Sequence, residues 1–169
     1  PDKYIKILKR GIVNLHSSYL PDYRGMHPLN WAIINGETST GVSAHWMDNK
    51  LDTGPIIDQI KIDIDFYDDI NSLRIKTDNI IAILSYKLIL DYMKTGKISN
   101  GIHQYKYKHH FYAKKRISKD SLIVLKGKTI LEIYNFCRAL YSPYPNAYFI
   151  YNNGFICITE VFEIIYFKQ

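Results

Sequence analysis

The chain has 169 residues, enough for about one large domain or one and a half small ones. A hydrophobic content of 47% with 22% charged residues is typical of a soluble globular protein, and the longest apolar run, residues 80–93, is too short to span a bilayer. The net charge of +6 is compatible with nucleic acid, an anionic membrane or a phosphate-bearing small molecule, and by itself it selects none of them.

The first half of the chain is expected to alternate short helices and strands. Gly11 ends the first helix, Pro28 suits the first turn of the second, and Ile60, Ile62 and Ile64 alternate with charged residues as in a half-buried strand. In chain order we expect a helix at 2–9, a buried strand at 12–15, a loop at 17–28, a helix at 28–34, a strand at 40–47, a loop at 48–54 and a strand around 60–64.

The second half is expected to begin with a long helix, whose apolar run should be buried. Asp68 and Asp69 suit the positive end of that helix, and Thr129 with Glu132 forms the capping box of a later one. In chain order we expect a helix at 68–94, a polar connector at 97–119, a helix that starts after residue 129 and ends at 142–143, and a hairpin of residues 147–151 and 155–159 turned at 152–154.

The two cysteines are too few for a disulfide framework or a metal cluster. Cys137 and Cys157 each lie among apolar residues, so we expect buried free thiols. A reducing compartment fits this usage and no secretory signal pattern is visible, so we expect a cytoplasmic location.

Three side chains have the chemistry of an acyl-transfer site that uses no covalent nucleophile. Asn14 and His16 are two residues apart on a predicted strand, so they point to the same side of it, and Asp52 lies in the loop that follows a later strand. An amide donates to a carbonyl oxygen, an imidazole manages protons or stabilises an oxyanion, and a carboxylate favours the charged form of the imidazole. A satisfied polar pair at a strand end is the alternative for Asn14 and His16.

The stretch around these residues resembles the folate-dependent formyltransferases, a family that acts on methionyl-tRNA, glycinamide ribonucleotide or amino sugars. The resemblance rests on N-x-H, S-x-L-P-x-Y-R-G, P-x-x-W-A-I-x-N-G-E, T-G-V, H-x-M and D-T-G-P-I, which occur in family order between Gly11 and Gln59. A second segment, Arg138-Ala139-Leu140 followed by P-Y-P-N-A, is similar to the start of the family's C-terminal domain. An isolated N-x-H would indicate no function, whereas this ordered series of motifs is a specific signal for the family.

The resemblance implies an α/β fold: the C-terminal part of a Rossmann-like formyltransferase sheet flanked by helices, followed by a small α+β module. The family has a nucleotide-fold half upstream of its N-x-H strand, and we expect that half to be missing from this sequence. The implied organisation is a partial catalytic domain at residues 1–104, a linker at 105–118 and a small C-terminal domain at 119–169.

The resemblance also implies roles for the three central residues, with 10-formyltetrahydrofolate as the co-substrate and no metal. Asn14 would donate to the formyl oxygen, His16 would be cationic or a proton shuttle, and Asp52 would raise the pKa of His16 and organise a water that relays the proton.

Other positions are implied to bind the folate or support the site. His45 has a supporting or a structural role, Arg24 and Gly25 belong to a loop beside His16, and Ser17 directly follows that histidine. Arg24 would contact an anionic acceptor or tie its loop to the scaffold, and the scaffold role is slightly favoured. The loop expected beside the folate pterin, with an ordinary surface turn as the alternative, consists of Met47, Asp48, Asn49, Lys50 and Leu51.

The acceptor is expected to be a primary amine on a small molecule, and an amino-sugar nucleotide is favoured. About 50 residues follow the connector, which suits a module smaller than the C-terminal barrel of the tRNA enzyme. Charged tRNA stays open as the acceptor, as do hydrolysis of formyltetrahydrofolate and a non-catalytic module that binds RNA or a protein partner. The basic and aromatic run at 105–116 is more typical of a solvated linker than of a nucleic-acid site, no membrane partner is expected, and a homodimer is left open.

Overall fold

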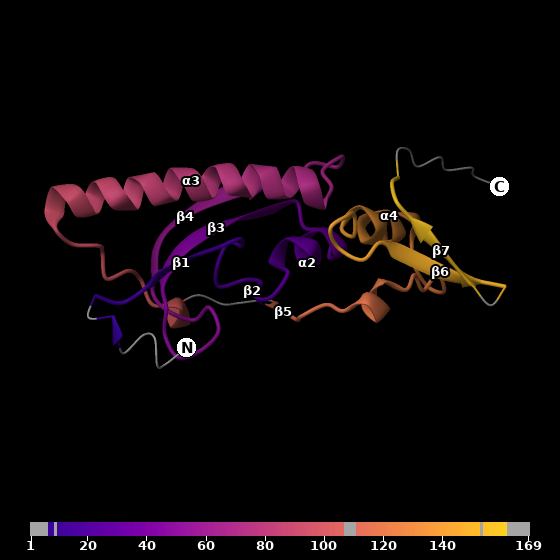
Figure 1. The fold of residues 1–169 in the computed structure, drawn as a ribbon, viewed down its shortest axis with the longest axis horizontal. Coiled ribbons are helices and arrows are strands. Elements are labelled where there is room, and N and C mark those ends of the chain that lie inside the picture. The colour runs from indigo at the N-terminus through magenta and orange to yellow at the C-terminus, as the bar shows by residue number, and fades with distance from the viewer. Residues whose placement is uncertain (1–6, 9, 107–110, 153, 162–169) are drawn as a thin grey trace.

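A computed structural model describes residues 7–8, 10–106, 111–152 and 154–161 of the chain, and its ribbon is drawn in Figure 1. Most of the helix predicted at 2–9 and part of the basic run at 105–116 lie outside these residues. No helix among the described residues is long and apolar enough to cross a membrane.

A three-stranded antiparallel sheet forms the centre of the first half. Its order is β1 (Val13–His16), β3 (Ser39–Trp46) and β4 (Ile56–Asp63), so the most buried strand lies in the middle. The register pairs Asn14 with His45 and His16 with Ser43. Because directly opposed residues of an antiparallel pair project to the same face, this register places Asn14 beside His45.

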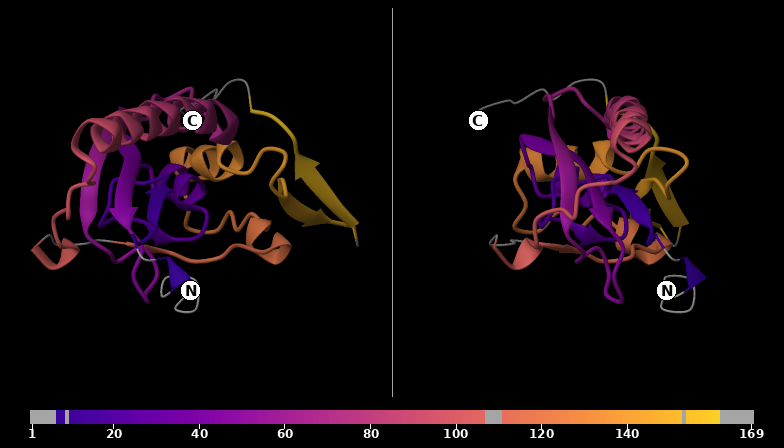
Figure 2. Two further views of the ribbon diagram at one scale, coloured as in Figure 1. Left: turned by 60° about the vertical axis from the view of Figure 1, so that its left-hand side comes forward. Right: turned by 90° about the vertical axis from the view of Figure 1, so that its left-hand side faces the viewer.

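The helices begin where local sequence signals predict, although the helix that starts after Thr129 ends at Arg138 and not at the predicted 142–143. Helix α2 (Pro28–Ile34) has proline in its first turn, and α4 (Ile130–Arg138) starts with the predicted Thr129–Glu132 capping box. The long helix α3 (Ile70–Thr95) is capped by the side chain of Asp69 and ends at Gly96, whose φ of 69° is left-handed. In Figures 1 and 2, α3 runs alongside β3 and β4.

The rest of the described chain adds two small two-stranded sheets and two short helices. A two-residue strand, β2 (Arg24–Gly25), pairs in parallel with β5 (Tyr112–Ala113), and two short 3-10 helices, η1 (Gln104–Lys106) and η2 (Ser118–Ser121), flank β5 along the chain. The predicted hairpin is present as β6 (Ala147–Tyr151) and β7 (Gly154–Ile158).

One hydrophobic core joins elements from both sides of the predicted linker. Leu29 and Ile33 of α2, Leu73 of α3 and Cys137 of α4 belong to it, as does Ala113 from β5. The core includes residues from all three proposed segments. The domain boundaries proposed from the sequence stay a prediction. The buried members of the core are Tyr23, Leu29, Ala32, Ile33, Ile64, Ile70, Leu73, Ala113, Ile123, Cys137, Ala139, Leu140, Tyr141 and Ala147.

Two expectations about apolar side chains are wrong. Cys137 is 1% exposed as predicted. Cys157 is exposed, because its side chain lies on a two-stranded hairpin that is largely uncovered. Helix α3 is not buried all round: one face packs on the sheet while Ile75, Ile83, Tyr86, Ile89 and Met93 are exposed. A groove of about 300 Å³ lies between α3 and the outer strand β1, lined by Val13, Leu15, Ser85, Leu88, Ile89, Tyr92 and Ile98.

Candidate active site

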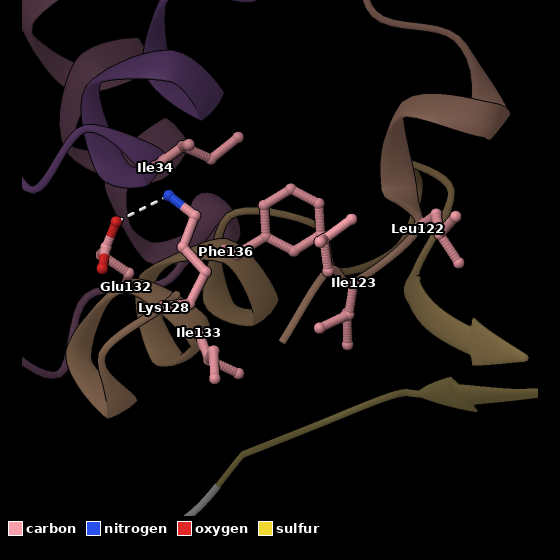
Figure 3. Close-up of a pocket in the computed structure, with 8 residues that line it drawn as sticks. Ile34, Leu122, Ile123, Lys128, Glu132, Ile133 and Phe136 are labelled. Atoms are coloured by element: carbon pink, nitrogen blue, oxygen red, sulfur yellow. Dashed lines mark hydrogen bonds and ion pairs between the residues drawn. The ribbon is translucent and has the colours of Figure 1, made fainter. Parts of the chain in front are cut away.

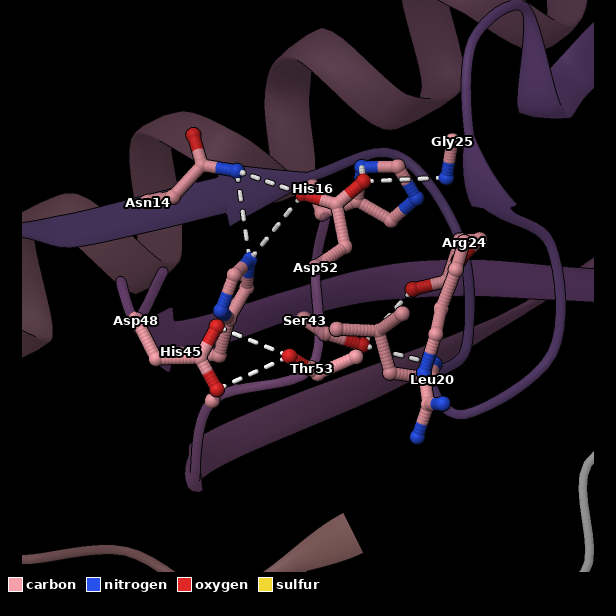
Figure 4. A network of polar contacts seen from close by, with 12 residues as sticks. Asn14, His16, Leu20, Arg24, Gly25, Ser43, His45, Asp48, Asp52 and Thr53 are labelled. Atoms are coloured by element: carbon pink, nitrogen blue, oxygen red, sulfur yellow. Dashed lines mark hydrogen bonds and ion pairs between the residues drawn. The ribbon is translucent and has the colours of Figure 1, made fainter. Parts of the chain in front are cut away.

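The side chains of Asn14, His16 and Asp52 converge at the end of the sheet (Figure 4). Asn14 Nδ2 lies 3.5 Å from Asp52 Oδ1, and His16 Nδ1 lies 3.7 Å from Asp52 Oδ2. Strand β1 presents the amide and the imidazole on one face, and the loop after β3 returns the carboxylate to them. The structure therefore brings together the three residues that the sequence singled out.

The ring of His16 is held in one tautomer. Its Nε2 donates to the carbonyl oxygen of Tyr23 at 2.9 Å, because a carbonyl can only accept. In the neutral ring the lone pair is then on Nδ1, which faces Asp52.

Burial decides the charge of His16. Desolvation lowers its pKa below the ordinary histidine value, although Asp52 and the Tyr23 carbonyl both act to raise it. Of the two roles expected for this imidazole, the lowered pKa therefore argues against the permanently cationic one. Burial outweighs the carboxylate, and a neutral imidazole suits the second expected role, proton transfer.

Asp52 is ionised in this setting and held by its backbone and its neighbours. Burial alone would raise its pKa, but the contact with His45, the proximity of His16 and a hydrogen bond from the Gly25 amide lower it overall. Gly25 N donates to Asp52 Oδ2 at 2.9 Å. Asp52 also has a left-handed φ of 52°, a conformation that aspartate and asparagine adopt more often than most other non-glycine residues.

His45 orients the amide of Asn14. The Nδ1 of His45 donates to the Trp46 carbonyl at 2.9 Å, so its Nε2 accepts from Asn14 Nδ2 at 3.2 Å. His45 is 2% exposed, and its Nε2 also lies 3.6 Å from Asp52 Oδ1. Of the two roles left open for His45, supporting or structural, its contact with Asn14 favours the supporting one.

The loop after β3 is closed by its own polar groups. The carboxylate of Asp48 accepts from the Lys50 amide at 3.1 Å and from Thr53 Oγ1 at 2.8 Å. At the base of the loop, a Cβ on Gly54 would lie 1.8 Å from the carbonyl oxygen of Trp46, so only glycine fits there. Met47 N donates to the Ile12 carbonyl, while Asn49, Lys50 and Leu51 are exposed at the tip. Recognition of the pterin by this loop stays a prediction.

Arg24 is buried, and its guanidinium donates hydrogen bonds within the scaffold. Its Nε and Nη2 donate to Gln104 Oε1 at 2.9 and 2.7 Å, and its Nη1 donates to the Tyr112 hydroxyl at 3.1 Å. These contacts match the scaffold role considered for Arg24. Gly25 must be glycine, because its φ is 111° and a Cβ would lie 2.2 Å from the Ala113 carbonyl oxygen.

Sequence reasoning missed the residues that hold the loop between β1 and β2 in place. Ser43 Oγ donates to the Ser18 carbonyl at 2.7 Å and accepts from the Leu20 amide at 2.9 Å, and Gln59 donates to both Ser43 and the Leu20 carbonyl. Ser17, expected to support the site, is half-buried directly after β1. An inward-facing polar side chain on a buried strand was the available signal for Ser43.

Two further observations concern the described residues outside this network. Among the described residues, no group of histidine, cysteine, aspartate or glutamate side chains has the arrangement of a metal site. An apolar cavity of about 260 Å³ lies between α2, α4 and the segment at 122–124 (Figure 3), and none of the three central residues lines it. Its lining residues are Ile34, Leu122, Ile123, Val124, Lys128, Glu132, Ile133 and Phe136.

The chain is similar to formyltransferases over most of its length. Residues 1–83 match the family model described as formyl transferase. The bifunctional polymyxin resistance protein ArnA of Wigglesworthia glossinidia brevipalpis is 40% identical over 146 residues, which is 85% of this chain and 21% of that protein. The methionyl-tRNA formyltransferase of Flavobacterium psychrophilum is 36% identical over 141 residues, 82% of this chain and 42% of that enzyme.

Solved structures agree with the sequence relatives. A likely sugar N-formyltransferase from Mycobacterium tuberculosis superimposes with a TM-score of 0.73 at 27% identity, over 91% of this chain and 66% of that one. The N-formyltransferase from Helicobacter canadensis, solved in complex with folinic acid and dTDP-3-aminofucose, gives 0.64 at 29% identity, over 76% and 46%. These matches confirm the resemblance and the fold class predicted from the motifs; the chain spans less than half the length of the two curated relatives described above.

Proposed function

We propose that this chain, whose residues 1–83 match the formyl transferase family, carries the machinery that moves a formyl group from 10-formyltetrahydrofolate to a primary amine. The observation that carries the proposal is the convergence of Asn14 and His16 on Asp52, whose carboxylate oxygens lie 3.5 Å from Asn14 Nδ2 and 3.7 Å from His16 Nδ1. Amide, imidazole and carboxylate together provide a hydrogen-bond donor for a developing oxyanion and a path for a proton.

Asn14 is suited to stabilise negative charge on the formyl oxygen. One N–H of its amide is committed to His45 at 3.2 Å. The other points towards Asp52 Oδ1 at 3.5 Å, a long contact that is weak as a hydrogen bond. That second N–H is therefore the one available to donate to a carbonyl oxygen bound beside it. Loss of one oxyanion donor typically lowers turnover by about 10²–10³-fold.

His16 is suited to move the proton. The folate supplies an activated formyl group, whose carbon–nitrogen bond breaks as the new bond to the amine forms. A neutral imidazole with its lone pair on Nδ1 takes the proton that the amine loses, and it returns a proton to the leaving nitrogen. Asp52, which stays ionised, stabilises the imidazolium while it exists.

The loop after β3 is suited to bind a formylated folate. The loop of Met47, Asp48, Asn49, Lys50 and Leu51 begins directly after His45 and Trp46, and its exposed tip offers backbone groups for the pterin edge. The two matched structures with folate-type ligands support the same co-substrate, since they were solved with folinic acid and with 5-N-formyl-THF.

We propose an amino-sugar nucleotide as the acceptor. Support comes from the structural relatives above 25% identity, which are described as sugar N-formyltransferases or were solved with a dTDP-linked amino sugar or dTDP. The net charge of +6 suits an acceptor that bears phosphates. Charged tRNA is the second candidate, favoured by the 36% identity to a methionyl-tRNA formyltransferase.

The test offers the full-length protein 10-formyltetrahydrofolate with a panel of amino-sugar nucleotides, charged initiator tRNA, or buffer alone. Formylation of a sugar nucleotide supports the proposal, and formylation of tRNA overturns the choice of acceptor. Folate release without any acceptor indicates hydrolysis instead, and no turnover with RNA retained indicates a binding module. His16→Ala should abolish turnover without unfolding the protein, whereas His103→Ala, at an exposed histidine, should leave turnover unchanged.

A further inference from the structure

Gln104 lies at the start of η1 and connects the two loops that build the site. It is 2% exposed and makes four hydrogen bonds with its side-chain amide. Its Oε1 accepts from Arg24 Nε and Nη2, and its Nε2 donates to the backbone carbonyls of Asp52 at 2.9 Å and Gly54 at 2.8 Å. No motif in the sequence marks this residue.

The orientation of the Gln104 amide is fixed by its partners. A guanidinium only donates and a carbonyl oxygen only accepts, so the reversed amide would lose all four bonds. The backbone around Gln104 is also fixed, because Ile102 and Ile56 exchange two hydrogen bonds of 2.9 and 2.7 Å just upstream.

These bonds act on Asp52 from two directions. Through the Asp52 and Gly54 carbonyls, Gln104 holds the turn in which Asp52 has its left-handed φ of 52°. Through Arg24 it holds the segment whose next residue, Gly25, donates its amide to the Asp52 carboxylate. Both the backbone of Asp52 and the donor to its side chain thus depend on one buried amide.

We propose that Gln104 is a positioning residue that keeps the Asp52 carboxylate beside His16. This inference rests on the proposed function, in which Asp52 stabilises protonated His16. Gln104 touches neither the imidazole nor the carboxylate, and it acts through the peptide carbonyl of Asp52 and through Arg24.

Gln104→Glu separates the two halves of this role. A carboxylate at 104 still accepts from Arg24, and with opposite charges it does so more strongly. It has no donor for the carbonyls of Asp52 and Gly54, so it repels them. The variant therefore keeps the scaffold contact and removes only the bonds that fix the turn.

Asn30→Asp is a matched control remote from the site. Asn30 is also a buried amide that donates to a backbone carbonyl, that of Ala139 at 2.7 Å. Arg116 lines the same small cavity, so a guanidinium is near the new carboxylate in this variant as well. The control makes the same amide-to-carboxylate change at a buried site without touching Asp52.

The experiment measures kcat and KM for formyl transfer by the full-length protein, together with an NMR titration of the His16 ring. In Gln104→Glu we expect kcat to fall about 100-fold, as for a displacement of about 1 Å at a reacting group, with KM for the folate nearly unchanged. The midpoint of the His16 titration should move to lower pH, because a displaced Asp52 no longer favours the imidazolium. Asn30→Asp should show neither change.

Three results would overturn the inference: an unchanged kcat, an unchanged His16 titration in Gln104→Glu, or an equal loss of kcat in Asn30→Asp. If the unmodified protein transfers no formyl group at all, the proposed function fails. The His16 titration still decides whether Gln104 positions Asp52 in that case, so the two failures are distinguishable.

Discussion

Replacing Asp52 with asparagine removes one charge from the site and little else. Asparagine tolerates the left-handed backbone at this position as aspartate does, and its side-chain oxygen still accepts from the Gly25 amide. The substitution therefore isolates the electrostatic role of the carboxylate from its role in shaping the loop.

The expected size of the effect follows from the separation of the two groups. The carboxylate lies 3.7 Å from His16 Nδ1 in a largely buried site. Opposite unit charges at about 4 Å attract by about 4 kcal/mol at an effective dielectric constant of about 20. Each 1.36 kcal/mol of lost transition-state stabilisation lowers the rate about tenfold, so Asp52→Asn should lower kcat by about 10³-fold.

The assay compares initial rates of folate release, with a saturating amino-sugar nucleotide, for the unmodified protein and Asp52→Asn. The melting temperature should fall only modestly at neutral pH, because the fold lowers the pKa of Asp52 and so favours the charge that the substitution removes, while the Gly25 hydrogen bond is kept. Asp58→Asn is the control, since Asp58 forms a surface ion pair with Lys87, and it should keep its full rate. An Asp52→Asn variant that keeps more than a tenth of the turnover would refute the electrostatic argument.

Three further predictions concern stability and reactivity. The melting temperature should drop as pH falls below about 6.5, because the unfolded chain binds a proton that buried His16, with its lowered pKa, does not; His16→Gln should flatten this dependence, and an equal slope in that variant would contradict the assignment. Gly25→Ala should destabilise the fold by about 3 kcal/mol in denaturant titrations, since its Cβ would meet the Ala113 carbonyl; a loss below about 1 kcal/mol would contradict the geometry. In thiol titrations of the native protein Cys157 should react quickly, and Cys137, whose pKa burial raises to about 11, only on unfolding; early reaction of Cys137 would show that its packing is wrong.

Local signals in the sequence predicted most of the elements. Pro28 marks the start of α2, the Thr129–Glu132 pair marks the start of α4, and turn-forming residues in the sequence predicted the hairpin of β6 and β7. Each of these features depends on residues within a few positions of one another, so the chain need not be folded for them to be recognised. The two-residue spacing of Asn14 and His16 likewise placed both on one face of a strand.

Features that depend on contacts between distant segments could not be predicted in this way. Gln104 is 52 residues from Asp52, and nothing near it in the sequence indicates that its amide holds that loop. The charge of His16 was predicted from a neighbouring carboxylate alone, but it depends on the burial that the whole fold produces. The exposure of Cys157 follows from the packing of its hairpin. The apolar residues next to Cys157 in the sequence do not predict that packing.

The most direct test of the central claim follows an isotopic label in the formyl carbon of 10-formyltetrahydrofolate. After incubation with the full-length protein and an amino-sugar nucleotide, the account predicts the label on the sugar nitrogen, at a rate that His16→Ala and Asp52→Asn reduce. Label that stays on the folate, appears only as formate, or reaches the sugar equally fast with His16→Ala would contradict it.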